Sequence, residues 1–231
     1  MKIGIIGAMD EEVSILKAKL TNMETTVIAG CEFYQGELHG KPVILTKSGI
    51  GKVAAAIATT LLLGRFNPGQ VINTGSAGGY DTTLDVGDIV ISTEVRFHDV
   101  DLTAFGYEIG QMAQLPAAFP ADKNLIVAAQ KAADTITHLK TIQGLICTGD
   151  IFMADPSKAE IARHNFPTMA ACEMEAAAIA QVCYQFNVPF VIVRSLSDIA
   201  GKKSELSFDQ YLPIAAKNAS ILVEEMVNNL N

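Results

Sequence analysis

Short apolar runs alternate with helical patterns along the whole chain, and this alternation restricts the fold more than any other feature. The apolar runs predict strands over residues 2–8, 42–48, 71–74, 87–98, 142–148, 169–174 and 189–195, and a hairpin or two short strands within 25–38. The helical patterns cover residues 11–20, 49–63, 122–133, 157–164, 176–186 and 207–229, and residues 99–120 resemble a loop. Strands that alternate with helices form a mainly parallel sheet with helices on both faces, so the sequence predicts an α/β fold.

We expect the chain to form a single domain over residues 1–231. Hydrophobic residues make up 49% of its 231 residues, which suffices for one sizeable core. No linker rich in proline, serine or glycine, no internal repeat and no low-complexity segment divides the sequence. One domain is therefore the simplest interpretation.

The charge balance restricts the partners. The chain has 25 acidic and 17 basic side chains and a net charge of −8, whereas nucleic acids and anionic membranes require a basic surface. No run of about eighteen apolar residues is present. Acids at residues 10–12 end the N-terminal apolar run, which otherwise resembles the start of a signal peptide. We therefore expect a soluble, cytoplasmic protein with no nucleic-acid or membrane partner.

The cysteines and histidines predict no metal site and no cofactor. Cys31, Cys147, Cys172 and Cys183 form no Cys-x-x-Cys pair, and none lies near a histidine at metal-ligand spacing. Cys147 and Cys183 lie inside apolar runs, so we expect them to be buried, reduced thiols.

Polar residues that directly follow strands are the candidates for chemistry, because ligands of open α/β sheets bind beyond the carboxyl ends of the strands. The first such segment is Gly-Ala-Met-Asp-Glu-Glu at residues 7–12. Favourable interaction with a helix N-terminus, about 0.3–1 kcal/mol each, explains Asp10 and Glu11. Glu12 shares a helix face with Leu16, so it points toward the packed side. A buried carboxylate is costly without a role, which makes Glu12 a functional candidate beside the helix-dipole explanation.

The second segment is Gly-Ser-Ala-Gly-Gly at residues 75–79. Its glycines would let a ligand approach the backbone closely, and Ser76 offers a hydroxyl. The segment lacks the Lys-Ser or Lys-Thr ending of a phosphate-binding P-loop, so an ordinary turn after a strand also explains it.

The third segment contains Glu173 and Glu175, which share one face of an extended chain and precede an alanine run that allows close packing. A carboxylate here could accept hydrogen bonds from two ribose hydroxyls. Favourable charge at a helix N-terminus remains an explanation for one of the two.

In the fourth segment, a buried strand is followed by Arg194, Ser195, Ser197 and Asp198. Asp198 could be a helix cap, but residues 199–203 are a poor start for a helix, which favours a functional role. Carboxylates from three strand ends would then meet at one edge of the sheet. Paired carboxylates are suited to glycosidic cleavage, in which one protonates the leaving group and another activates water.

These segments together resemble the 5′-methylthioadenosine/S-adenosylhomocysteine nucleosidase family over essentially the whole chain. The matching motifs are Ile-Gly-Ala-Met-Asp-Glu-Glu-Val at 6–13, Ser-Gly-Ile-Gly-Lys-Val at 48–53, Asn-Thr-Gly-Ser-Ala-Gly-Gly at 73–79, Thr-Ala-Phe-Gly-Tyr-Glu at 103–108, Glu-Met-Glu-Ala at 173–176, Arg-Ser-Leu-Ser-Asp at 194–198 and Leu-Ser-Phe at 206–208. The resemblance implies a three-layer, nucleoside phosphorylase-like fold around a central mixed sheet, and a homodimer. It also implies hydrolysis of methylthioadenosine and S-adenosylhomocysteine, and of 5′-deoxyadenosine, to adenine and the sugar, in methionine salvage and methyl-cycle recycling.

The resemblance further implies roles for individual residues. Asp198 would protonate the purine at N7, Glu12 would activate water, and Glu175 would hold the ribose hydroxyls. The other implied contacts are Met174 against the sugar, Ser197 beside Asp198, Ser76 and Arg194 around the water and sugar, Phe152 on adenine with backbone groups of Ile151 and Met153, Ile50 and Phe208 around the 5′ group, and Leu102, Phe105 and Tyr107 from the partner subunit.

The chain departs from the family pattern at a few positions. Ile151 replaces a smaller residue at the purine edge, and residues 111–116 differ from a shorter pattern, so both bear on specificity. Ser195 and Cys172 replace apolar residues and carry none of the implied chemistry.

Two other functions compete with hydrolysis. A phosphorylase of the same fold needs an arginine in the first loop to hold phosphate, but acids occupy that loop here, which favours water. A nucleoside-binding sensor without catalysis is disfavoured because both Asp198 and Glu12 are present.

Overall fold

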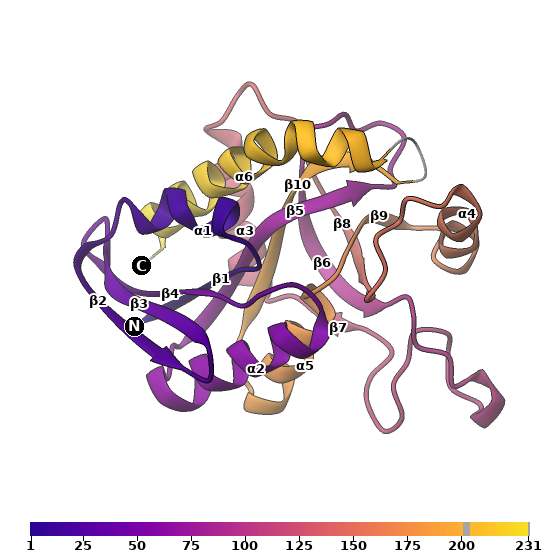
Figure 1. Cartoon of the computed structure of the whole chain (residues 1–231), viewed down its shortest axis with the longest axis horizontal. Helices are drawn as coiled ribbons and strands as arrows, with labels where there is room; N and C mark the ends of the chain where they lie inside the picture. The colour runs from indigo at the N-terminus through magenta and orange to yellow at the C-terminus, as the bar shows by residue number, and fades with distance from the viewer. Residues whose placement is uncertain (201–203, 231) are drawn as a thin grey trace.

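The computed structural model describes residues 1–200 and 204–230, the side chains of 204–207 excepted (Figure 1). The strands are β1 (Ile3–Gly7), β2 (Thr21–Ile28), β3 (Cys31–Leu38), β4 (Lys41–Lys47), β5 (Gln70–Gly79), β6 (Ile89–Phe97), β7 (Phe119–Pro120), β8 (Thr141–Thr148), β9 (Met169–Glu173) and β10 (Phe190–Ile199). The helices are α1 (Asp10–Lys17), α2 (Lys52–Leu61), α3 (Lys123–Asp134), α4 (Pro156–Asn165), α5 (Ala176–Phe186) and α6 (Ser204–Asn229). A π-helical turn, η1 (Leu62–Phe66), extends α2, and a 3-10 turn, η2 (Thr103–Phe105), lies between β6 and β7.

The central sheet is mixed, and part of it closes on itself. Strands β5, β10, β6, β8 and β9 pair in a ring, because β10 pairs with both β6 and β5. Strands β1, β4, β3 and β2 continue the sheet from β5. Pairing is parallel between β5 and β10 but antiparallel between β10 and β6. The prediction of a mainly parallel open sheet is therefore corrected to a partly closed mixed sheet, and the mixed sheet implied by the family resemblance is confirmed.

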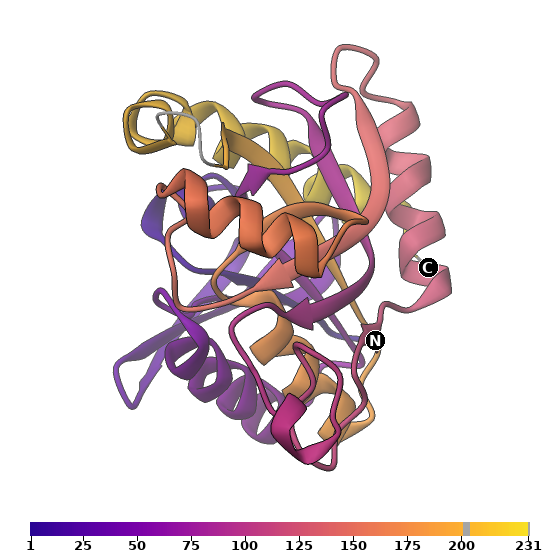
Figure 2. The ribbon, with the colours of Figure 1, turned by 90° about the vertical axis from the view of Figure 1, so that its right-hand side faces the viewer.

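Helices cover both faces of the sheet, as the alternating pattern predicts (Figure 1). Helices α1, α3 and α6 pack together on one face, and α2 and α5 pack together on the other. The main core lies between these layers and is formed by isoleucine, valine, leucine and alanine side chains from strands and helices. Figure 2 shows α4 and the segment that carries η2 on the side of the molecule where β6, β8 and β9 lie.

Two strands extend further than the sequence predicts. Strand β5 was expected to end at residue 74 and β10 at residue 195, yet they continue to Gly79 and Ile199. The reason is the ring of strands: Ala77, Gly78 and Gly79 pair with the last residues of β10, and Gly78 also pairs with β9. Backbone partners on both sides make strand the stable conformation even for a glycine-rich segment.

Other differences are local. The segment 99–120 contains η2 and the short β7 rather than loop alone, and α6 begins at Ser204 instead of residue 207. Residues 201–203, which counted as a poor helix start, lie outside the described residues. Two helices begin as their sequences predict, because Asp122 and Asp155 accept hydrogen bonds from the first free N–H groups of α3 and α4.

No helix within the described residues is long and apolar enough to cross a membrane. The four cysteines are buried free thiols, as expected for Cys147 and Cys183. Burial raises the pKa of the Cys183 thiol to about 12, which keeps it unreactive near neutral pH.

Candidate active site

A pocket of about 220 Å³ opens where β5, β9 and β10 meet the starts of α1 and α6. Its walls contain residues predicted from the sequence and several that were not. The lining residues are Ala8, Met9, Glu12, Ile50, Ser76, Ala77, Gly78, Phe152, Cys172, Glu173, Met174, Glu175, Ser197, Asp198 and Phe208. The pocket therefore unites the three carboxylate-bearing segments that were predicted to meet, and residues 76–78 of the glycine-rich segment lie with them.

Glu12 is buried at the start of α1 and is held by four donors. Its Oε2 accepts the N–H of Ala8 at 2.8 Å and that of Met9 at 3.2 Å. Its Oε1 accepts the Ser76 N–H at 2.8 Å and the Ser76 hydroxyl at 3.0 Å. The Met9 contact is half of a helix capping box, so Glu12 also stabilises the start of α1. Helix capping alone does not require the contact with Ser76. This contact brings the Glu12 carboxylate to β5 and into the pocket.

Asp198 reaches the pocket because of an irregularity in β10. Pairing with β5 shifts between Leu196 and Asp198, so Ser197 and Asp198 together face Gly78. An extra residue of this kind is a β-bulge, which redirects the following side chain. The Ser197 hydroxyl donates to Asp198 Oδ1 at 2.9 Å, and the other oxygen lies beside Gly78. Asp198 is thus a strand residue at a bulge, not a residue after the strand end.

Glu175 is the N-cap residue of α5 and is buried in the pocket wall. Its Oε1 accepts one hydrogen bond, from the Gly51 N–H at 2.8 Å. Burial, with the nearby charge of Glu173 as the next cause, raises the pKa of Glu175 from 4.5 to about 8. The raised pKa favours the protonated form of the Glu175 carboxyl near neutral pH.

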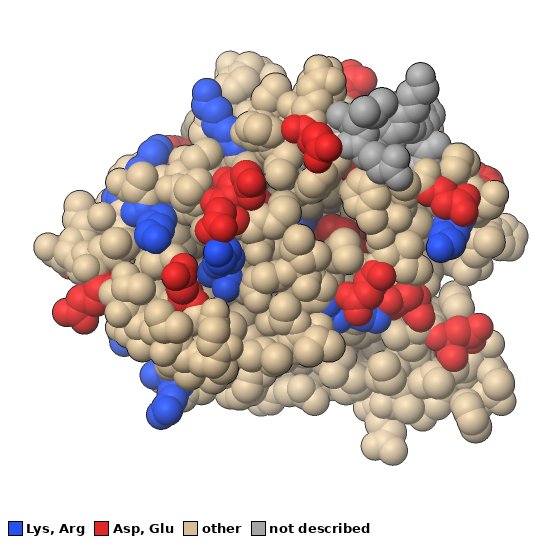
Figure 3. All heavy atoms as spheres, in the orientation of Figure 1, with Lys and Arg blue, Asp and Glu red and all other residues tan. Residues whose placement is uncertain are grey.

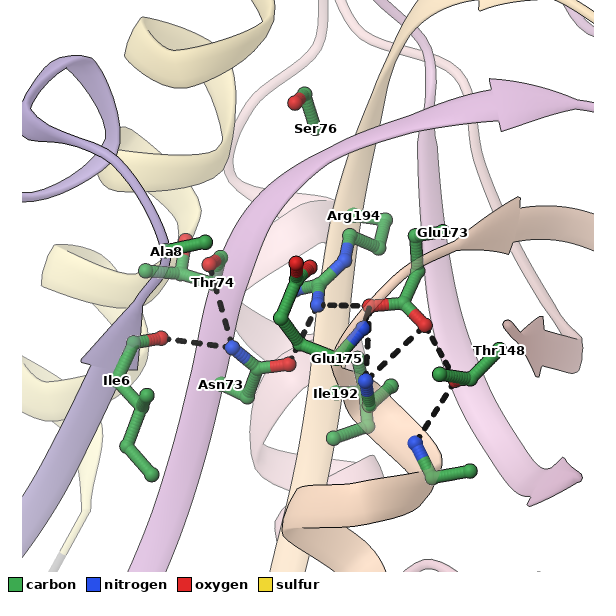
Figure 4. Close-up of polar contacts among 12 residues, drawn as sticks. Ile6, Ala8, Asn73, Thr74, Ser76, Thr148, Glu173, Glu175, Ile192 and Arg194 are labelled. Carbon is green, nitrogen blue, oxygen red and sulfur yellow. Dashed lines mark hydrogen bonds and ion pairs between the residues drawn. The ribbon is translucent and has the colours of Figure 1, made fainter. Parts of the chain in front are cut away.

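Behind this wall lies a buried polar network centred on Arg194, which is 1% exposed (Figure 4). One guanidinium nitrogen, Nη2, donates to Glu173 Oε2 and to Asn73 Oδ1, both at 2.6 Å. Glu173 also accepts the N–H groups of Glu175 and Ala176 and the hydroxyl of Thr148. Burial disfavours the charged guanidinium, but the carboxylates around it outweigh that effect and raise the pKa of Arg194. The ion pair therefore compensates the charge of Glu173 and fixes the backbone that carries Glu175.

The model of the phosphorylase superfamily matches residues 2–228 of this chain. A protein of Psychromonas ingrahamii named 5′-methylthioadenosine/S-adenosylhomocysteine nucleosidase is 94% identical over 231 residues, which cover both chains completely. The chain belongs to the 5′-methylthioadenosine/S-adenosylhomocysteine nucleosidase family. The family resemblance of the sequence motifs is thereby confirmed.

Solved structures of nucleosidases from this family have the same fold. The enzyme from Colwellia psychrerythraea 34H, in complex with adenine, superposes with a TM-score of 0.97 at 57% identity, covering 98% of this chain and 94% of that one. The enzyme from Neisseria meningitidis, in complex with methylthio-immucillin-A, gives a TM-score of 0.98 at 47% identity over 99% of both chains. The nucleoside phosphorylase-like α/β fold is confirmed by these similarities.

The structure brings together most of the residues that the nucleosidase motifs nominate. Those that line the pocket are Glu12, Ile50, Ser76, Phe152, Met174, Glu175, Ser197, Asp198 and Phe208. The rings of Phe152 and Phe208 meet edge to face with centroids 5.6 Å apart, so they form one aromatic corner of the pocket.

Other nominated residues do not line this pocket. Arg194 is not among the lining residues and donates a hydrogen bond to Glu173, which is. Ile151 and Met153 flank Phe152 in a small separate cluster of apolar side chains. Leu102, Phe105 and Tyr107 belong to the segment around η2, which projects from the body of the chain, and they are not among the residues that line the pocket (Figures 1 and 2). The departures at Ser195 and Cys172 are accommodated, because Ser195 donates to the Gly87 carbonyl and Cys172 is a buried pocket residue.

Sequence reasoning missed several residues that support the site. Asn73 bridges strands β1 and β5 through the Ile6 carbonyl, and its side-chain oxygen accepts from Arg194. Thr148 and the Gly51 N–H hold Glu173 and Glu175. A buried asparagine at the centre of an apolar strand was the available signal for Asn73, since buried amides require partners. Nothing in the sequence indicates the backbone donor at Gly51.

Proposed function

We propose that this chain hydrolyses the N-glycosidic bond of 5′-methylthioadenosine and S-adenosylhomocysteine, and of 5′-deoxyadenosine, releasing adenine. The observation that carries the proposal is a single pocket that contains Asp198, Glu12 and Glu175 in three different hydrogen-bonding environments. Family membership supports the choice of adenine and of a 5′-thio group, since the relatives bear that name and one binds adenine. The reaction belongs to methionine salvage and to recycling of the methyl cycle.

In the proposed reaction, Asp198 carries a proton to N7 of the purine. Bond cleavage leaves positive charge on the ribose, which the Glu12 carboxylate stabilises electrostatically. Glu12 then accepts a proton from the water that attacks C1′, so the products are adenine and the thioribose. The Ser197 hydroxyl donates to one oxygen of Asp198 and so helps to orient its carboxyl group toward the purine.

Ser76 occupies a lone-pair direction of Glu12 that the attacking water needs. Each carboxylate oxygen accepts about two hydrogen bonds, and both oxygens of Glu12 already accept two. The hydroxyl of half-buried Ser76 is the only one of these donors that can rotate away without moving backbone. We infer that water replaces this hydroxyl, or is bridged by it, when the substrate is bound.

Water is favoured over phosphate as the nucleophile. Among the described residues, the pocket lining contains four carboxyl groups, those of Glu12, Glu173, Glu175 and Asp198, and no basic side chain. An anion placed there would be repelled in a medium of low dielectric constant, where charge interactions are strong. The described arginine closest to these acids, Arg194, already donates to Glu173 and Asn73.

Adenine release from methylthioadenosine, measured with and without phosphate, tests the proposal. Hydrolysis predicts equal rates in both conditions and free methylthioribose as the product. A requirement for phosphate would identify a phosphorylase, and nucleoside binding without adenine release would identify a sensor. Comparison of the three nucleosides under the same conditions would rank them as substrates.

We also propose that the chain forms a homodimer through α2. Val53 and Ile57 on this helix are exposed, and Lys52 is its only charged residue. In Figure 3 the surface over α2 and α5 is mainly uncharged. Phe105, 79% exposed on the projecting η2 segment, lacks apolar cover in the single chain. A partner placed on α2 would cover these side chains and bring its own Leu102, Phe105 and Tyr107 toward Ile50 and the 5′ group.

A further inference from the structure

Three charged residues outside the pocket join the segments that form two of its walls. Asp99 Oδ2 accepts the Lys52 ammonium at 2.6 Å and the Asp150 N–H at 3.0 Å. Asp150 Oδ1 accepts the backbone N–H of Lys52 at 2.8 Å, and its other oxygen lies 3.9 Å from the Lys52 ammonium. The end of β6, the start of α2 and the end of β8 are therefore tied together by two carboxylates and one ammonium.

The immediate neighbours of this cluster are pocket residues. Ile50 and Gly51 directly precede Lys52, and the Gly51 N–H is the donor to Glu175. Phe152 follows Asp150 by two residues and also lines the pocket. Gly51 has a φ of +91°, and a Cβ there would lie 3.0 Å from Asp150 Oδ1, so the carboxylate packs directly on the glycine.

We propose that Asp150 is a positioning residue, which holds the N-terminus of α2 so that the Gly51 N–H meets Glu175 and the pocket receives the ribose hydroxyls. Asp150 is not among the described residues that line the pocket, and it adjoins that lining through Gly51, which follows Ile50, and through the chain that leads to Phe152. This inference rests on the proposed function, because it assigns Glu175 to the ribose.

The charged groups around Glu175 determine how its pKa would change if Asp150 no longer held Gly51 in place. Burial and Glu173 on β9 raise its pKa, Arg194 on β10 and the Gly51 N–H lower it, and Glu12 on α1 raises it further. A displaced Gly51 N–H removes an interaction that favours the ionised carboxylate, so the pKa rises further. Two ribose hydroxyls donate best to an ionised carboxylate. The acid limb of the pH profile, where kcat/KM rises with pH, should therefore move toward higher pH.

The test is the pH profile of adenine release by Asp150→Ala. We expect KM for methylthioadenosine to rise about three- to tenfold, the worth of one hydrogen bond, with little change in kcat and with the acid limb shifted upward. Asp150→Asn keeps an acceptor oxygen for the backbone N–H of Lys52, so the acid limb of its pH profile should match that of the wild type. Asp155→Ala is the matched control, because it removes the same kind of bond, to the Ser157 N–H of α4, outside the pocket lining.

Lys52→Met is the second variant and covers the case in which Asp150→Ala does not fold. It keeps the hydrogen bond from the backbone N–H of residue 52 to Asp150 but removes the ammonium between Asp99 and Asp150. The acid limb should therefore shift in the same direction as in Asp150→Ala, but by a smaller amount. A folded Asp150→Ala with an unchanged limb and KM overturns the inference, as does the same shift in Asp155→Ala. If the wild type releases no adenine, the proposed function fails and the inference fails with it. An active wild type with an unaffected Asp150→Ala overturns the inference alone.

Discussion

At the scale of single residues, the pocket distinguishes its carboxylates by their hydrogen-bond donors. Four N–H or O–H groups point at Glu12, and all four interact best with the ionised form. Glu175 accepts a single backbone N–H and is otherwise surrounded by burial and negative charge. The two neighbouring carboxyls therefore differ in how firmly hydrogen bonds hold them, with four donors to Glu12 and one to Glu175.

Asp198→Asn should abolish most of the activity, because the amide cannot deliver a proton to the purine. We expect kcat to fall by about 10²–10⁴-fold while nucleoside binding survives, and Glu12→Gln to behave in the same way. Steady-state adenine release and calorimetric binding measure the two effects separately. Ser197→Ala is the comparison, with a smaller loss of about fivefold, since it removes only one hydrogen bond to Asp198. Near-normal turnover by either carboxylate variant would show that its role is wrong.

The raised pKa of Glu175 predicts a pH-dependent stability. A carboxyl whose pKa is higher in the folded chain stabilises the fold fully below the unfolded value, 4.5, and this contribution is lost as the pH rises through about 8. The free energy of unfolding of the wild type should therefore fall between these pH values relative to that of Glu175→Gln. Urea unfolding at a series of pH values measures the difference. As a control, the free energy of unfolding of Glu160→Gln, at an exposed carboxylate of α4, should change with pH in the same way as that of the wild type.

At the scale of elements, strand β5 and helix α1 are fitted to each other around Glu12. A Cβ added to Gly75 would lie 2.7 Å from Glu12 Oε1 and 2.9 Å from its carboxyl carbon. Only glycine therefore lets the strand approach the carboxylate closely enough for the Ser76 N–H to donate to it. The glycine-rich segment, for which an ordinary turn was one explanation, is a strand shaped by a neighbouring side chain.

Gly75→Ala should accordingly impair catalysis. The added methyl group displaces the Glu12 carboxylate from its four donors, and we expect kcat to fall about 10²-fold, in line with the misplacement of a catalytic group by about 1 Å. Enzyme assays together with thermal unfolding measure this effect. Gly64→Ala is the matched control, because nothing lies within 4 Å of a Cβ at that position. Equal activity of the two variants would contradict the fit between β5 and α1.

At the scale of the whole molecule, the pocket depends on the ring closure of the sheet. Because β10 pairs with β5 and β6, and β9 pairs with β5 and β8, Asp198, Ser76 and Glu173 come from adjacent strands of one ring. The layer of α2 and α5 completes the wall through Gly51 and Glu175. The face of α2 that is not packed on α5 remains apolar and exposed, which is the basis for the proposed dimer.

Val53→Asp should separate the dimer and weaken catalysis. Val53 is 71% exposed on α2, so the charge costs little in the single chain but would be buried without a partner in a dimer. We expect sedimentation velocity to show a monomer and KM to rise more than kcat falls, because the 5′ group loses the partner's side chains. Val127→Asp on α3, at a similarly exposed valine, should leave the dimer intact. A wild-type monomer with full activity would refute the proposal.

The sequence by itself determined the alternation of strands and helices and the identity of the carboxylates that meet in the pocket. Each of these depends on local patterning or on residue type, which a linear chain displays directly. Only the tertiary structure decided the closure of the sheet, which extends β5 and β10, and the bulge that aims Asp198. It also placed Arg194 behind the wall and the Gly51 N–H against Glu175. Those features arise from pairing between distant strands and from backbone donors, and neither leaves a periodic or compositional signal in the sequence.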